Sequence, residues 1–195
     1  AYDAYAPDVL LSGGIPVYVT LKHPDYHVDW NEVQDAITAK TKLIILNSPH
    51  NPTGTVLGPE DMAALADVVA DTNILIISDE VYEHIVFDGN RHESITRYPD
   101  LAQRSFVISS FGKTYSTTGW KLGYCLAPRQ LSEEFQRVHQ FVTYASNTPI
   151  QWAYAEFMEK KEKYLNLANF YQERRDLFLS LIRDSRFKPL PCKGT

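Results

Sequence analysis

The stretch ILIISDEVYEH, residues 74–84, decides the fold of this 195-residue chain. It begins with an apolar run, Ile74 to Ser78, which has the length and composition of a buried strand. Polar and charged residues follow at once, beginning with Asp79. In an open α/β sheet, ligands bind at the carboxyl ends of the strands. The pattern therefore predicts a buried strand whose end opens into a binding crevice.

Similar apolar runs occur elsewhere in the chain, and helical patterns lie between them. We predict further strands at Val17–Leu21, Lys42–Asn47 and Phe106–Ser110. Helices are predicted at Asp29–Lys40 and Pro59–Asp71, where apolar residues recur at helical spacing. Strands that alternate with helices indicate an α/β fold with a mostly parallel sheet and crossover helices.

The pattern changes after Pro128, where long helical segments replace the alternation. These segments are Leu131–Thr143 and Ile150–Ile182, with a break expected near Leu165–Asn169. A turn at Asn147–Pro149 starts the second of them. The last residues of the sequence, which are rich in proline and glycine, are expected to begin a second subdomain.

Composition excludes several classes of protein. With 44% hydrophobic and 22% charged residues, the chain resembles an ordinary globular protein of one large domain, or of one domain and part of another. A formal net charge of −5 argues against nucleic-acid binding, which needs a basic face to neutralise phosphates, so we expect no nucleic-acid partner. No apolar run approaches the ~20 residues that a membrane helix requires, so we expect no membrane partner.

The cysteines and histidines point to no disulfide framework and no metal site. Cys125 and Cys192 are interpreted as reduced thiols of a cytoplasmic protein. The six histidines are scattered, so no metal ligands are assigned. The sequence has no initiator methionine and no secretory leader, and both ends fall in segments that are predicted to be ordered.

Five chemically active residues follow three of the predicted strands and should meet at one edge of the sheet: Asn51, Asp79, Tyr82, Ser110 and Lys113. Taken singly, Asp79 is typical of a helix N-cap and Lys113 of a solvated side chain. Together they supply what Schiff-base chemistry on a pyridine cofactor needs. An amine forms the imine, an acid keeps the ring nitrogen protonated, and hydroxyl and amide groups donate to the phenolate oxygen.

Three better-known motifs are absent. Gly112 to Thr114 reads GKT, but a P-loop would need its first glycine at the position of Val107. The sequence contains no GxGxxG, and His92-Glu93 lacks the second histidine of a zinc-protease motif.

The three motifs NSPHNPTG, SDEVYEH and SSFGKTYSTTGWKLGY, in this order, resemble the pyridoxal-phosphate-dependent class I/II aminotransferases of fold type I. The nearest branch contains methionine, kynurenine and glutamine–phenylpyruvate aminotransferases. The resemblance implies a three-layer α/β/α fold and pyridoxal phosphate as cofactor. It assigns residues 1–186 to the major part of the cofactor-binding large domain and residues 187–195 to the start of an incomplete C-terminal small subdomain.

The resemblance also implies roles for single residues. Lys113 corresponds to the lysine that forms the Schiff base and moves the substrate's proton, and Asp79 to the acid that pairs with the pyridine nitrogen. Tyr82 and Asn51 correspond to the two donors to the phenolate oxygen. The remaining cofactor-binding positions are Ser110 and Lys121 at the phosphate and Tyr2 against the ring face. The catalytic set is thus Lys113, Asp79 and Tyr82.

One position departs from the family pattern, and two family features fall outside the chain. Lys121 stands where the family most often has arginine, and it supplies charge without the planar guanidinium fork. The glycine-rich phosphate loop and the arginine that binds the substrate carboxylate are expected before Tyr2 and after Thr195. The chain is therefore expected to be about half of a longer protein and to be inactive alone. Family members form homodimers with shared active sites, so Val138–Pro149 could face a partner subunit.

Three functions remain open from the sequence. The first is transfer of an amino group from a neutral, aromatic or sulfur-containing amino acid, such as methionine, to a 2-oxo acid. The second is β-elimination from cysteine conjugates, a C–S lyase reaction that uses Lys113, Asp79 and Tyr82 in the same way up to the carbanion. The third, a non-catalytic regulator, is disfavoured because a binding module has no physical need for the lysine.

Overall fold

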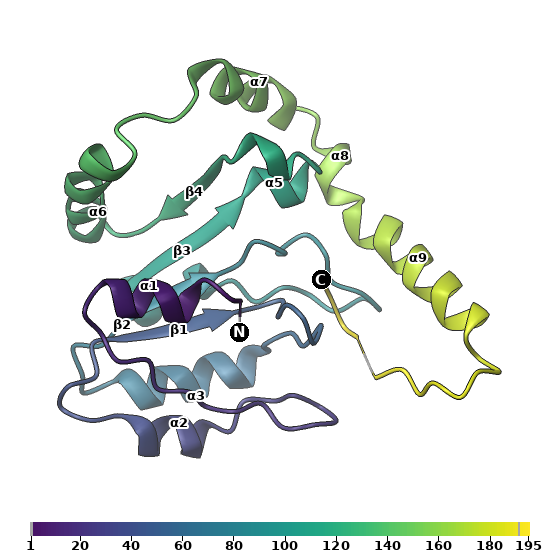
Figure 1. Cartoon of the computed structure of the whole chain (residues 1–195), viewed down its shortest axis with the longest axis horizontal. Coiled ribbons are helices and arrows are strands. Elements are labelled where there is room, and N and C mark those ends of the chain that lie inside the picture. The colour runs from purple at the N-terminus through teal and green to yellow at the C-terminus, as the bar shows by residue number, and fades with distance from the viewer. Residues whose placement is uncertain (1, 191) are drawn as a thin grey trace.

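The computed structural model of the chain describes residues 2–190 and 192–195; Ala1 and Pro191 lie outside the described residues. A four-stranded sheet runs through the middle of the molecule (Figure 1). Its strands are adjacent in chain order: β1 (Leu43–Asn47), β2 (Leu75–Asp79), β3 (Ser105–Ser110) and β4 (Gly123–Leu126). The first three are parallel, and β4 runs antiparallel to β3. The prediction of an α/β fold with a mostly parallel sheet is confirmed, and β1 to β3 lie within one residue of their predicted bounds.

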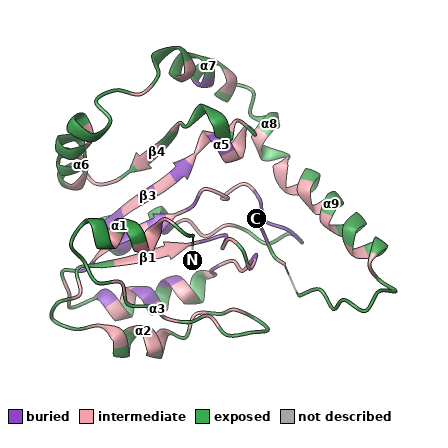
Figure 2. Cartoon of the chain, viewed as in Figure 1, coloured by how far each residue is buried: buried purple, intermediate pink, exposed green. Residues whose placement is uncertain are grey.

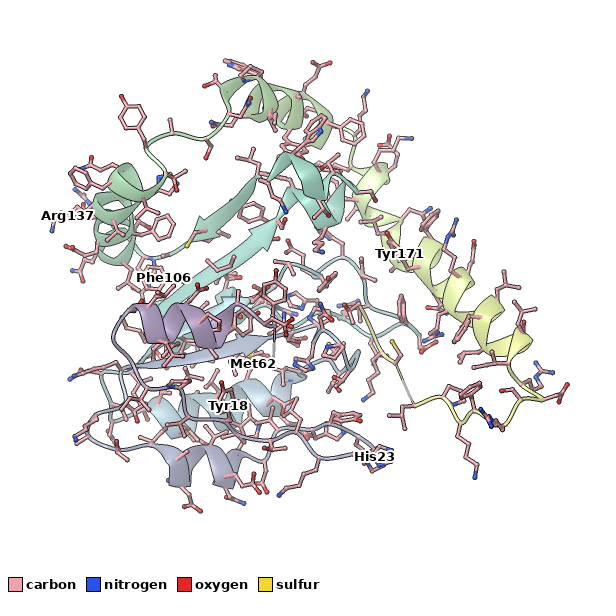
Figure 3. The ribbon with its side chains drawn as sticks, viewed as in Figure 1. Tyr18, His23, Met62, Phe106, Arg137 and Tyr171 are labelled. Carbon is pink, nitrogen blue, oxygen red and sulfur yellow. The ribbon has the colours of Figure 1, made fainter. Side chains whose placement is uncertain are left out.

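The strand predicted at Val17–Leu21 is not formed. This segment, which carries Tyr18 (Figure 3), is irregular. Val17 and Tyr18 are 69% and 67% exposed. A strand is stable only when its backbone groups bond to a neighbouring strand. Within residues 2–190 and 192–195, no strand pairs with this run. The β-branched composition of this segment therefore predicted a strand, but the strand does not form because no neighbouring strand in the described part of the chain pairs with it.

Helices α2 (Trp30–Ala36) and α3 (Pro59–Val69) lie together on one side of the sheet (Figure 1). Asp29 caps α2, accepting from the backbone N–H groups of Asn31 and Glu32, but the helix ends four residues before its predicted end. Asp61 binds the two helices together, because its carboxylate accepts from the Trp30 indole at 2.9 Å and from the Gly58 N–H at 2.8 Å.

The main core lies between α3 and the sheet. The apolar stripe of α3 meets the side chains of β2 and β3 that point to this side, and Figure 2 shows buried residues on these same elements. Members of the core are Leu57, Met62, Leu65, Val69, Ile74, Ile76, Ile95, Leu101 and Val107. Arg104 closes the end of α3, since its Nη1 donates to the carbonyls of Val69 and Thr72 at 2.9 Å each and of Ile74 at 3.3 Å.

The other face of the sheet is covered less completely, by α1 (Tyr5–Leu11) and α6 (Arg129–Val142). Phe135 of α6 packs against Phe106 of β3 with ring centroids 6.4 Å apart. In Figure 3, Phe106 lies on this side and Met62 on the side of α3. Residues of β2 and β3 that point to this face are only half-buried, and the candidate site lies at its edge.

Helical segments make up most of the chain after β4. The helix predicted at Leu131–Thr143 is α6, and Asn147 starts α7 (Thr148–Met158) by accepting from the Ile150 N–H at 3.1 Å. The expected break occurs at Asn166, between α8 (Glu162–Leu165) and α9 (Leu167–Leu181). A second break, at residues 159–161, was not predicted. Short helical turns complete the fold: η1 (Ile95–Arg97), α4 (Pro99–Ala102), α5 (Phe111–Thr114) and η2 (Thr118–Trp120).

Residues 192–195 return to the sheet edge and lie between two loops (Figure 1). The Lys193 N–H donates to Gly54 O at 2.9 Å, and the Thr195 N–H donates to Ile85 O at 2.9 Å. Gly54 has a φ of +71°, and a Cβ there would lie 2.5 Å from Cys192 Sγ, so glycine is needed for this approach. Arg175 of α9 fastens the segment by donating to Cys192 O at 3.0 Å and to both carboxylate oxygens of Asp88.

No helix in the described part of the chain combines the length and apolar character needed to cross a membrane.

Candidate active site

The carboxyl ends of the three parallel strands bring the predicted site residues to one edge of the sheet. In the ladder, Asn47 stands opposite Asp79, and Asp79 stands opposite Ile108, two residues before Ser110. The segments that leave these strand ends hold Asn51, Tyr82 and Lys113 in turn. The prediction that these side chains share one edge is therefore supported by the register.

Asp79 is held by Tyr5 of α1. The Tyr5 hydroxyl donates to Asp79 Oδ2, and the Val81 N–H donates to Oδ1 at 3.2 Å. Burial and the adjacent Asp79 carboxylate raise the pKa of Tyr5 far above its usual value, because a phenolate would be both desolvated and beside a negative charge. Tyr5 therefore stays protonated and acts as a hydrogen-bond donor to the acid.

Lys113 and Tyr82 meet beside this pair. The Lys113 ammonium lies 5.5 Å from the centre of the Tyr82 ring, within the range of a cation–π interaction. Tyr82 is close enough to Tyr5 to add to the rise in its pKa, as does Tyr2. The amine, the phenol and the acid thus belong to one cluster.

Tyr2 reaches the cluster through Tyr5. The two rings are in edge-to-face contact with centroids 5.7 Å apart, and Tyr2 remains 56% exposed. An aromatic ring in this position leaves one face available to pack against a planar ligand.

Asn51 is held through its backbone. Its N–H donates to Asn47 Oδ1 at 3.0 Å, while Asn47 Nδ2 donates to Asp79 O at 3.1 Å. The side-chain amide of Asn51 forms no hydrogen bond with any residue that the structure describes, and the same holds for the Tyr82 hydroxyl and the Lys113 amine. These groups are available to a ligand.

Ser110, Gly112 and Lys121 are brought together by a tight turn. Ser110 Oγ accepts from the Gly112 N–H at 3.2 Å, and a Cβ on Gly112 would lie 2.9 Å from Thr118 Cα. β4 then pairs Gly123 with Ser110, so Lys121 lies two residues from the partner of Ser110. The Lys121 side chain is exposed, and its φ is +54°, an uncommon value for a residue other than glycine. A hydroxyl and an ammonium near one turn suit an anion.

Two further carboxylates lie next to the site, Glu80, which is buried, and Glu83, which is half-buried. Glu80, 2% exposed, accepts from Ser78 Oγ and the Ile95 N–H, and its other oxygen lies 2.7 Å from His92 Nε2. Burial alone would raise the pKa of Glu80, but His92 and the other donors hold it below its usual value. Nδ1 of His92 is buried without a partner among the described residues.

Glu83 is the second carboxylate next to the site. Its Oε1 accepts from Ser109 Oγ at 2.7 Å and from the Tyr124 hydroxyl at 2.9 Å. Burial and the carboxylates of Glu83 and Glu80 raise the pKa of Tyr124 to about 12. Tyr124 therefore remains a neutral donor that ties β4 to the segment carrying Tyr82.

The sequence reasoning did not single out Tyr5 or Asn47, although both contact predicted site residues. Tyr5 lies three residues after Tyr2 in the sequence, and this proximity was the available signal. Asn47 is the last residue of an apolar strand, in the same relation to β1 as Asp79 to β2.

These groups fit pyridoxal phosphate in their chemistry. They offer an amine, an acid held by a phenol, two neutral donors, and a turn with a hydroxyl and an ammonium in which an additional Cβ at Gly112 would collide. The described residues contain no group of three histidine, cysteine, aspartate or glutamate side chains placed to hold a metal ion.

Comparison with known proteins places this arrangement in a family. The family model for class I and II aminotransferases matches residues 1–195. The chain is 46% identical to methionine aminotransferase of Escherichia coli, with 100% of the chain and 51% of that protein aligned. It is 38% identical to kynurenine–oxoglutarate transaminase of Dictyostelium discoideum, with 100% of the chain and 49% of that protein aligned.

A solved structure agrees with these sequence matches. The crystal structure of an Escherichia coli protein described as having a methionine aminotransferase function superposes with a TM-score of 0.98 at 46% identity. The superposition covers 100% of this chain and 52% of that one. The chain thus spans about half the length of the curated relatives it matches.

Proposed function

The chain belongs to the family of class I and II aminotransferases, which depends on pyridoxal phosphate, and from this membership we propose that the whole protein is a transaminase. It transfers an amino group from a neutral, aromatic or sulfur-containing amino acid to a 2-oxo acid. Methionine-like donors are favoured because the 46% identical relative is a methionine aminotransferase. The observation that carries the proposal is the cluster of Lys113, Tyr82 and Asp79 at one sheet edge.

Each residue of the cluster has a task in this reaction. When bound, pyridoxal phosphate supplies an electron-withdrawing ring that stabilises negative charge at the substrate's α-carbon. Asp79, fixed by Tyr5, holds a proton on the ring nitrogen. Lys113 Nζ would hold the cofactor covalently in the absence of substrate, and with substrate bound its free amine would accept the α-proton and return it.

The other residues bind and orient. Tyr82 and Asn51 would donate to the cofactor's phenolate oxygen and so stabilise its negative charge. Ser110 and Lys121 hold the phosphate at the turn around Gly112. Tyr2 packs on one face of the ring, next to Tyr5.

Labelling of Lys113 tests the proposal. The whole protein is incubated with pyridoxal phosphate and reduced with borohydride, and the modified lysine is mapped by peptide mass spectrometry. A single adduct at Lys113 is expected, absent from Lys113→Ala and retained in Lys160→Ala, which removes a lysine of the exposed turn after α7. Adducts scattered over surface lysines of the whole protein would overturn the assignment.

Product analysis separates transamination from the lyase reaction. Both reactions need the same lysine, acid and phenol, but β-elimination from a cysteine conjugate releases pyruvate without a 2-oxo acid acceptor. The family and both relatives favour transamination. We expect amine transfer from methionine to a 2-oxo acid to exceed pyruvate release from a cysteine conjugate. The opposite ratio would establish the lyase.

The whole protein is further proposed to be a homodimer. Apolar side chains at the end of α6 and just after it are highly exposed, with Phe141 at 85% and Tyr144 at 86%. Both lie in Val138–Pro149, the stretch that the family resemblance assigns to a partner subunit. A second copy of the protein would cover this surface.

A further inference from the structure

We propose that Asn47 is a positioning residue that couples Asn51 to Asp79 and so sets the affinity and the ionisation of the bound cofactor. The inference rests on the proposed function. It concerns the side chain at the end of β1, which has no role in the chemistry itself. Its evidence is the pair of hydrogen bonds that Asn47 makes to two site segments.

Both polar atoms of the Asn47 side chain are used. Oδ1 accepts from the Asn51 N–H at 3.0 Å, and Nδ2 donates to Asp79 O at 3.1 Å. The side chain is half-buried at the strand end, and the two partners lie 28 residues apart in the chain, since 79 − 51 = 28. One amide therefore joins the loop after β1 to the end of β2.

The other hydrogen bonds of Asp79 do not replace the link that Asn47 makes to Asn51. Asp79 O also accepts from the Ser48 N–H at 3.1 Å, which continues the ladder between β1 and β2 but does not reach Asn51. The Asp79 carboxylate is held separately, by Tyr5 and the Val81 N–H. Among the hydrogen bonds between described residues, only those of Asn47 connect Asn51 to Asp79 through one side chain.

These two hydrogen bonds require an amide side chain. The side chain at position 47 must donate to a carbonyl with one atom and accept from an N–H with another, as asparagine does. Aspartate can only accept when ionised, and glutamine is one methylene longer. Leucine has a similar size but forms neither bond. Asn47→Leu therefore removes both bonds while filling most of the space.

Loss of the Asn47 hydrogen bonds is expected to affect the cofactor through their two partners, Asn51 and Asp79. Asn51 donates to the phenolate oxygen only if its backbone is correctly placed, and a displaced donor no longer stabilises the anion. Loss of that donor raises the pH at which the imine between Lys113 and the cofactor loses its proton. Displacement of Asp79 weakens binding of the ring.

The test uses the cofactor-loaded whole protein. The cofactor dissociation constant is measured by equilibrium dialysis, and the imine is followed by spectrophotometric pH titration. For Asn47→Leu we expect the dissociation constant to rise about tenfold, corresponding to the loss of two hydrogen bonds. The titration midpoint should rise by roughly half a pH unit. Asn73→Leu is the matched control, because Asn73 is exposed at the opposite end of β2 and is expected to leave both values unchanged.

A double-mutant cycle separates positioning from a general structural effect. Asn51→Ala alone should raise the midpoint, and adding Asn47→Leu should change it by less than half of the effect seen in wild type. Full additivity would overturn the inference. Asn47→Ala, which adds no bulk, serves as a second variant. If both substitutions at Asn47 lower the melting temperature but leave the midpoint and the dissociation constant unchanged, the role is structural and the inference fails.

The outcomes also separate this inference from the proposed function. If wild-type protein forms no adduct at Lys113, the proposed function fails, and the inference fails with it. If the Lys113 adduct forms and Asn47→Leu behaves as wild type, only the inference fails.

Discussion

At the scale of single residues, the candidate site depends on neutral donors that keep charges in place. Tyr5 shows this most directly, because burial and the adjacent Asp79 carboxylate raise its pKa far above the usual value, which favours the protonated phenol that donates to Asp79. This hydrogen bond fixes the orientation of the Asp79 carboxyl group. The site therefore relies on a phenol that does not itself react.

Replacement of Tyr5 tests this dependence. We expect Tyr5→Phe to raise the cofactor dissociation constant of the whole protein about tenfold, because a hydrogen bond to a charged group contributes about 1.5–3 kcal/mol. Tyr18→Phe is the control, since Tyr18 is 67% exposed on the irregular segment. Equilibrium dialysis measures both, and equal affinities for the two variants would contradict the expectation.

The buried Glu80–His92 pair predicts a pH dependence of stability. The pKa of Glu80 is lower in the folded chain than its usual value near 4.5, so the folded state favours the ionised form. This contribution to the free energy of unfolding is fully present above pH 4.5 and is lost as the pH falls through the lower folded pKa.

We therefore expect Glu80→Gln to destabilise the protein at pH 7 by about 1–3 kcal/mol, since it weakens hydrogen bonds to a buried charge. The difference from wild type should shrink below pH 4.5. Denaturant unfolding at pH 7 and at lower pH measures it. A difference that stays constant over this range would show that the charge of Glu80 does not contribute.

At the scale of elements, Arg104 joins α3 to β2. Its guanidinium donates to the carbonyls of Val69, at the end of α3, of Thr72, and of Ile74, just before β2, so it links the end of the helix to the start of the strand. We expect Arg104→Ala to lower the free energy of unfolding by about 1–3 kcal/mol because the hydrogen bonds from the charged guanidinium to three backbone carbonyls are lost. Arg183→Ala, in the exposed turn after α9, should change it by less than about 0.5 kcal/mol. Chemical denaturation compares the two, and equal losses would refute the capping role.

Elements were predictable from the sequence where local pattern and long-range partner agreed. β1 to β3 are apolar runs that find parallel neighbours, and α3 has both a proline start and a buried stripe. Val17–Leu21 has the composition of a strand but no neighbour to pair with in the described chain. β4 was missed because its short run lies within a stretch rich in glycine and threonine. Pairing with β3, which sequence patterning does not reveal, makes it a strand.

The positions of the candidate site residues were predictable from the sequence to a similar extent. Strand ends and motif spacing placed Asn51, Asp79, Tyr82 and Lys113 at one edge, and the structure brings them there. Asn47 and Tyr5 could not be found in this way, because their importance lies in hydrogen bonds that reach 32 and 74 residues along the chain. The roles of the site residues and the division at residue 186 remain predictions.

At the scale of the whole molecule, the exposed apolar residues at the end of α6 and just after it bear on assembly. We expect the whole protein to be a dimer by analytical ultracentrifugation and Phe141→Glu to shift it toward monomer, because a buried charge without a partner opposes association. Arg137→Glu is the control: it adds the same side chain to an exposed position of α6 that already forms an ion pair on the surface (Figure 3). A dimer unaffected by Phe141→Glu would place the interface elsewhere.

The segment at residues 192–195 has a consequence for how the protein is made. Its hydrogen bonds join it to Gly54 and Ile85, which a ribosome polymerises more than about 100 residues earlier. Contacts between such distant residues form late, because a long loop must close first. During synthesis the loop that carries Asn51 therefore emerges with its neighbouring strands but without the segment that later fastens it. The sheet edge that carries the candidate site is thus expected to be the last part of this half of the protein to reach its folded structure during synthesis.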